Sequence, residues 1–132
     1  MEKKRPEEPL EIELSCSEET VTLHLQRQLL LVIRRQVVAN VLDASSACIL
    51  SLRMGLTDGV CYTLKDVSKR MHLSPEVVRQ RQYLALKRCV RHLPFLQLLN
   101  EYAHIVKLPR GVTYYLYKFS DYDGELPRAD TT

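Results

Sequence analysis

The chain has 132 residues, enough for one domain of ordinary size, and its content of 45% hydrophobic and 27% charged residues is typical of soluble globular proteins. The formal net charge is +3, and the apolar run over residues 29–33 is far shorter than the roughly 20 residues of a membrane-spanning helix. The first residues lack the apolar core of a secretory signal, so we expect a cytoplasmic protein that neither enters a membrane nor is exported.

The first part of the chain predicts an arm followed by two helices. Residues 1–16 are acidic and lack periodicity, which favours a mobile arm outside the folded domain. From residue 17 to about residue 41, apolar residues recur mostly at steps of three and four, the spacing of a helix. Asp43 is a suitable N-cap for a second helix that ends at Gly55, before a turn over residues 57–59.

Two further helix starts follow in close succession. Thr63 is a suitable N-cap for a short helix that reaches about Met71. Ser74 is the N-cap of the next helix, which has Pro75 in its first position and runs to about residue 92. Two helices joined by a short turn, of which the second is strongly basic, form the helix-turn-helix pattern of DNA-binding proteins.

A helix-turn-helix requires small or apolar residues where its helices meet, and five positions supply them. These are Val67, Ser68, Met71, Leu73 and Val78. The later core position falls on Arg81, which is charged, so we expect Tyr83 or Leu84 to turn inward in its place, or a slight rotation of the helix.

Beyond this motif the period of the sequence changes. A short helix is predicted over residues 95–103, and two β-rich runs, 105–108 and 112–119, then flank a Pro-Arg-Gly turn. We therefore expect a β-hairpin over residues 104–122 and a loose tail over residues 123–132. Three roles are open to the hairpin: it covers the domain's own core, pairs with a partner strand or a second protomer, or touches DNA as a wing.

Charge is distributed unevenly along the chain. Residues 1–20 hold seven acidic and three basic side chains, whereas residues 63–92 hold eight basic and only two acidic ones. A basic window of this kind is typical of proteins that bind a polyanion, most often nucleic acid, although a solvated helix surface carries the same pattern.

The sequence offers no pattern typical of a metal site or an enzyme. The four cysteines, at positions 16, 48, 61 and 89, lack the spacings of a zinc site or a disulfide framework, so we expect reduced and mostly buried thiols. The histidines are isolated from other metal-ligating residues, and the four glycines are dispersed. We therefore expect neither a cofactor nor a catalytic activity.

Three segments of the chain resemble region 4 of bacterial sigma factors in fixed register. They are CILSLRMGLTDG from residue 48, TLKDVSKRM from residue 63 and SPEVVRQRQYLALKR from residue 74. The resemblance covers about residues 18–98 and is to the family patterns VL-LR-GL-DG, TL-EVG and T-E-IRQ---KALRKLR. It implies a mainly α, winged-helix-like helix-turn-helix domain over residues 17–103. The predicted β-hairpin lies outside the resemblance and is appended to this domain.

In this family the second helix of the motif reads an upstream promoter hexamer, and the earlier helices grip the flap of the RNA polymerase β subunit. Carried over by position, the resemblance implies that Glu76, Arg79 and Gln80 read bases, and their side chains suit cytosine, guanine and adenine respectively. The candidates for phosphate contacts or for the flanks of this helix are Thr63, Lys69, Ser74, Arg81, Lys87 and Arg88.

The chain also departs from the family pattern. Pro75 stands where the family usually has a base-contacting arginine, and Leu84 stands where a lysine often contacts DNA. Both side chains contact a base only by van der Waals packing, so the family's usual hexamer is not implied. There is no room for region 2, which melts the promoter, so another polypeptide supplies it or the protein recruits polymerase from a fixed site.

The function predicted from the sequence is specific binding of double-stranded DNA in transcription initiation, in the bacterial cytoplasm and at the nucleoid. The expected partners are DNA, the β-flap, a region-2-bearing protein and, as a homodimer, a second copy of the chain. Two alternatives remain open. A phage or mobile-element regulator would bind DNA without touching polymerase, and an interaction module would occupy the β-flap and block sigma.

Overall fold

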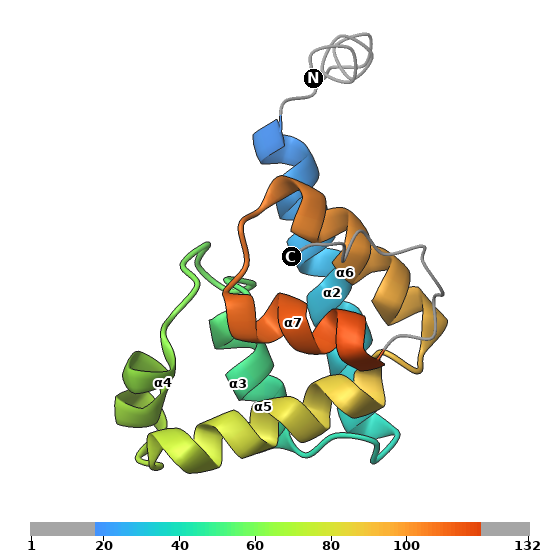
Figure 1. Ribbon diagram of the computed structural model, residues 1–132. Helices are drawn as coiled ribbons and strands as arrows, with labels where there is room; N and C mark the ends of the chain where they lie inside the picture. Colours follow the sequence, from blue (N-terminus) through green and yellow to red (C-terminus); the bar gives the residue numbers. More distant parts are fainter. Residues whose placement is uncertain (1–17, 120–132) are drawn as a thin grey trace, which may run out of the picture.

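The computed structural model describes residues 18–119, and every regular element in that part of the chain is a helix. In chain order the helices are α2 (Glu18–Val38), α3 (Ala44–Arg53), α4 (Leu64–Met71), α5 (Pro75–Cys89), α6 (Leu93–Ile105) and α7 (Arg110–Phe119). Figure 1 shows α5 along one edge of the molecule, and α3, α4 and α7 all pack against it. None of the helices within this range is long and apolar enough to cross a membrane.

The predicted starts of α3, α4 and α5 are confirmed by their caps. At each start a side-chain oxygen accepts a hydrogen bond from the amide three residues on, at 3.1 or 3.2 Å, and the capping residues are Asp43, Thr63 and Ser74. Each cap satisfies one of the amides that the first turn of a helix leaves without an intrahelical partner. The positions of these three helices therefore follow from local side-chain chemistry.

The main core lies between α2 and α6 and extends to α3 and α5. Phe95 and Tyr102 of α6 are the largest fully buried side chains. Aliphatic residues of the other helices surround them, among them Leu29, Ile33, Leu50, Met54 and Leu86. The packing of α6 along α2, visible in Figure 1, covers the apolar face of the long first helix.

A buried polar cluster joins α2, α6 and the end of α3. The Gln26 side-chain amide donates to the Tyr102 hydroxyl and to the Gly55 carbonyl, both at 3.1 Å. The Tyr102 hydroxyl donates in turn to the Met54 carbonyl at 2.7 Å. These carbonyls follow the last turn of α3, where the chain leaves the helix through Gly55 at a φ of 67°. The cluster thus satisfies helix-end carbonyls inside the core.

The predicted β-hairpin over residues 104–122 is wrong. Residues up to 105 belong to α6, and residues 110–119 form α7, whose first turn is closed by amides of residues 112 and 113 that donate to the Pro109 carbonyl at 2.9 and 3.2 Å. Consequently the described part of this segment provides neither a strand edge nor a β-wing.

The physical reason is that the sequence of α7 satisfies two periods at once. Its β-branched and aromatic composition favours a strand, but apolar residues also recur at 112, 115, 116 and 119, the spacing of one helix face. Packing against α5 decides between them, because Val112 is fully buried in the main core. The described residues do not include the predicted arm (1–16), the end of the predicted hairpin (120–122) or the predicted tail (123–132).

The three cysteines within residues 18–119 differ in burial more than expected, and Cys16 lies outside the described residues. Cys48 is exposed, Cys61 is half-buried and Cys89 is buried in the main core. Burial raises the pKa of the Cys89 thiol to about 12, so this thiol stays protonated at neutral pH. The expectation of mostly buried thiols therefore holds for Cys89 but not for Cys48.

Candidate nucleic-acid interface

Helices α4 and α5 meet at a small core of their own. Its fully buried members are Ile49, Val67 and Val78, one from each of α3, α4 and α5. Partly buried side chains complete it, namely Leu52, Tyr62, Leu64, Met71 and Leu73. The apolar contact positions predicted for a helix-turn-helix are therefore confirmed.

The turn between α4 and α5 is fixed by two features. His72 ends α4 in the left-handed region, at a φ of 57°. The Ser68 hydroxyl then donates to the carbonyl of Leu73. The small residue predicted at position 68 thus has a hydrogen-bonding role as well as allowing close approach of the helices.

The inward position of α5 after Val78 is Gln82. The expectation that Tyr83 or Leu84 turns inward is wrong, whereas the alternative of a slight rotation of the helix agrees with the burial of residue 82 in place of residue 81. Gln82 is 1% exposed, whereas Leu84 is 46% exposed and Tyr83 is half-buried. Arg81 lies one position before the buried row and donates to the Ser45 hydroxyl of α3 at 2.8 Å. It is therefore a half-buried residue at the edge of the helix rather than part of its core.

Gln82 is buried because it is the partner of a buried arginine. The Arg53 Nε donates to Gln82 Oε1 at 2.6 Å, and Arg53 Nη1 donates to the Tyr62 carbonyl at 2.9 Å. Arg53 is 6% exposed, and no carboxylate contacts it among residues 18–119. Burial lowers the pKa of its guanidinium, and neutral oxygens provide its hydrogen bonds.

Helix α7 closes over this pair through Gly111. A Cβ atom at that position would lie 3.2 Å from Arg53 Nη2 and 3.5 Å from Gln82 Nε2. Glycine therefore allows the backbone of α7 to approach the guanidinium closely. Hydrogen bonds of Arg53 thus join α3 to α5 and to the loop before α4, and α7 packs closely against the pair.

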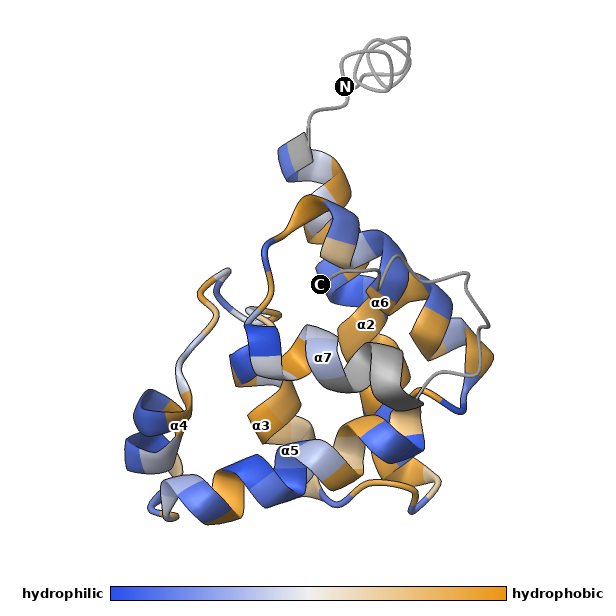
Figure 2. Ribbon diagram, viewed as in Figure 1, coloured by the Kyte–Doolittle hydropathy of each residue, from blue (hydrophilic) through white to orange (hydrophobic). Residues whose placement is uncertain are grey.

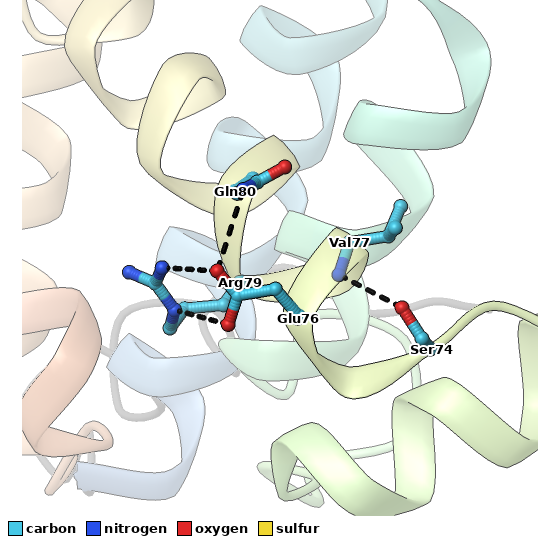
Figure 3. A network of polar contacts seen from close by, with 5 residues as sticks. All are labelled: Ser74, Glu76, Val77, Arg79 and Gln80. Atoms are coloured by element: carbon cyan, nitrogen blue, oxygen red, sulfur yellow. Dashed lines mark hydrogen bonds and ion pairs between the residues drawn. The ribbon is translucent and has the colours of Figure 1, made fainter.

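The three predicted base-reading residues lie together near the start of α5, as Figure 3 shows. Arg79 donates to both oxygens of Glu76, from Nε at 3.2 Å and from Nη2 at 2.5 Å. Gln80 donates to the same carboxylate at 3.3 Å. The pKa of the exposed Glu76 carboxyl lies below its ordinary value, chiefly because Arg79 donates hydrogen bonds to the carboxylate. The carboxylate thus orients both of the side chains that could donate to bases.

The predicted phosphate-contacting and flanking residues are spread over α4 and both ends of α5. All of them except Arg81 are exposed. Two belong to α4 or its cap, Thr63 and Lys69, and three belong to α5 or its cap, Ser74, Lys87 and Arg88. The hydroxyls of Thr63 and Ser74 are already used as caps. Lys69 and Lys87 form no ion pair with any residue in the described range, so their charges face solvent. Figure 2 shows hydrophilic residues prevailing on α4.

Arg81 and Arg88 also line an open cleft of about 430 Å³. The cleft lies between the turn that joins α2 to α3 and the second half of α5, and Leu84 forms part of its wall. The Arg88 guanidinium lies 3.4 Å from the Val41 carbonyl, to which it donates. Both arginines therefore border the exposed surface of α5 on the side of α3.

Sequence reasoning missed a second cluster, on the loop that precedes α4. The Tyr62 hydroxyl donates to Asp58 at 2.5 Å and accepts from Arg70 at 3.1 Å. The Arg70 guanidinium also stacks over the Tyr62 ring, 4.3 Å from its centroid. An aromatic residue eight positions before an arginine carries no recognised spacing, so only the fold brings these side chains together.

The chain matches no family model, no curated protein and no solved structure. In the part of the chain from 18 to 119, no group of three metal-ligating side chains could hold an ion. A nucleic-acid interface is therefore inferred from the arrangement of the residues described above.

Proposed function

We propose that the protein binds double-stranded DNA sequence-specifically, with the N-terminal part of α5 in the major groove. The observation that carries this proposal is the oriented network of Glu76, Arg79 and Gln80 at the start of the second helix of a helix-turn-helix. Residues at this end of a recognition helix are those that reach base edges. Arg79 suits guanine and Gln80 suits adenine.

The shape and charge of α5 support the same function. The helix has 15 residues and is therefore about 22 Å long, and one of its faces is buried while the other is open to solvent. The major groove, about 12 Å wide, admits a helix of this kind. Lys69 of α4 and Lys87 near the end of α5 are exposed and form no ion pair within residues 18–119, so both charges are available to neutralise phosphates.

DNA binding should depend strongly on salt. If about four to six of the eight basic residues in the window 63–92 neutralise phosphates, log K should fall against log salt with a slope of roughly −4 to −5. Fluorescence anisotropy of a labelled duplex, titrated at several potassium chloride concentrations, measures this slope. A slope near zero would remove nucleic acid as the ligand.

Replacing Arg79 with alanine should reduce both affinity and specificity. The expected cost is about 1–3 kcal/mol on the preferred site, with loss of discrimination at one base pair, because a bidentate contact to guanine is lost. Lys69→Ala is the matched control, since loss of a phosphate contact weakens binding to all sequences nearly alike. Selection from a random duplex library measures both profiles, and identical profiles for the wild type and Arg79→Ala would contradict the assignment of α5.

We further propose that DNA binding serves transcription initiation through contact with the RNA polymerase β-flap, in the bacterial cytoplasm and at the nucleoid. The resemblance to sigma region 4 supports this, because its second and third segments span α4 and α5 and its first segment begins within α3.

Two measurements on the full chain distinguish this role from its alternatives. The first is binding to the purified β-flap, and the second is binding to duplex DNA. DNA binding without flap binding would favour a regulator that does not touch polymerase. Flap binding without DNA binding would favour a module that blocks sigma.

A further inference from the structure

One apolar side chain lies within the basic, exposed surface of α5. The residues that face solvent along this helix recur at steps of three and four and are Glu76, Gln80, Leu84, Lys87 and Arg88. Leu84 is a large hydrophobic residue of α5, yet 46% of its surface is exposed. It lies between Gln80 on one side and the cationic groups of Arg81 and Arg88 on the other.

If Gln80 enters the major groove of DNA, Leu84 enters it as well. On a helix with 100° between successive residues, Leu84 is rotated by about 40° from Gln80 and lies about 6 Å further along the axis. That translation corresponds to roughly two base-pair steps of 3.4 Å. The buried row of α5, which contains Val78, Gln82 and Ala85, faces the opposite way. Leu84 therefore shares the exposed surface of the helix with the base-reading network.

The largest apolar group in the major groove is a methyl group. Each base pair presents hydrogen-bond donors and acceptors there, and the exception is the methyl group on C5 of thymine. A 5-methylcytosine places the same methyl group at the same ring position. A leucine side chain has no hydrogen-bonding group, so its favourable contact with a base edge is with this methyl group.

We infer that Leu84 is a specificity-determining residue that contacts a C5-methyl group of a pyrimidine, within the DNA-binding role proposed above. The contact selects thymine, or methylated cytosine, about two base pairs from the base read by Gln80. Arg81 and Arg88, which line the same cleft as Leu84, would contact the DNA phosphate backbone on the side of α3. These contacts would keep the methyl group of the base against the leucine side chain.

The experiment removes single methyl groups from the DNA. In the duplex selected from a random library, each thymine is replaced in turn by deoxyuridine, which differs only by the methyl group. Wild-type affinity should fall about fourfold at one position, the effect expected for one buried methyl group. In Leu84→Ala the same replacement should have no effect. A second duplex with 5-methylcytosine at that position distinguishes methylated cytosine from thymine as the preferred base.

Two further variants separate this role from a structural one. Leu31→Ala truncates a similarly exposed leucine on α2, 40% accessible, and should leave deoxyuridine sensitivity unchanged. Leu84→Lys should lose that sensitivity while binding all duplexes more tightly, with a salt slope steeper by about one. A wild-type protein that binds DNA but ignores every methyl group would overturn the inference, as would an unchanged deoxyuridine effect in Leu84→Ala. Absence of any DNA binding would instead overturn the proposed function.

Discussion

Replacing Arg53 with methionine should lower the free energy of unfolding by about 2–6 kcal/mol. Methionine retains most of the length of the side chain, so little cavity is created, but it cannot donate to the Gln82 amide oxygen or the Tyr62 carbonyl. A buried acceptor that loses its donor costs about 1–3 kcal/mol, and two are lost here. Urea denaturation followed by circular dichroism at 222 nm measures the change.

The matched control is the double variant Arg53→Met with Gln82→Leu. When both partners of a buried polar contact become apolar, the desolvation penalty of the remaining group disappears. We therefore expect the double variant to be more stable than Arg53→Met alone. The single variant Gln82→Leu completes the comparison. If the losses in the free energy of unfolding of the two single variants simply add in the double variant, Arg53 and Gln82 do not act as a pair.

The Arg53–Gln82 pair also explains why the register of α5 could not be derived from the sequence. A search for apolar residues passes over Gln82, because its polarity argues for the surface. Its partner lies 29 positions earlier on another helix. No local rule connects such residues, so the sequence pattern favours a neighbour of Gln82 as the buried residue.

Features that depend on short spacings were predictable. The caps at Asp43, Thr63 and Ser74 use amides three residues on, so the sequence defines where α3, α4 and α5 begin. The same holds for the candidate site. Residues 76, 79 and 80 are neighbours on any helix surface, because positions three and four apart face each other.

The C-terminal segment illustrates the opposite case. Residues 110–119 suit a strand by composition and a helix by spacing, so propensity alone gives no decision. Burial of Val112 between α7 and the rest of the core settles it. That contact exists only once α5 is in place, and it is therefore a tertiary effect.

A second large effect is expected from replacing Tyr102 with phenylalanine. The ring and its packing are retained, but the Met54 carbonyl loses its 2.7 Å hydrogen bond and Gln26 loses one of its two acceptors. We expect a loss of about 1–3 kcal/mol in the free energy of unfolding, because the carbonyl stays buried without a donor.

The pH dependence of this loss provides an independent check on the same contact. The pKa of the Tyr102 hydroxyl lies above its ordinary value of about 10, mainly because the side chain is buried. A raised pKa in the folded state means that the hydroxyl stabilises the fold fully below pH 10, where it is protonated in both states, and less as the pH rises further. The difference in stability between the wild type and Tyr102→Phe should therefore shrink above pH 10. A constant difference up to pH 11, or a variant as stable as the wild type, would mean that water rather than Tyr102 satisfies the end of α3.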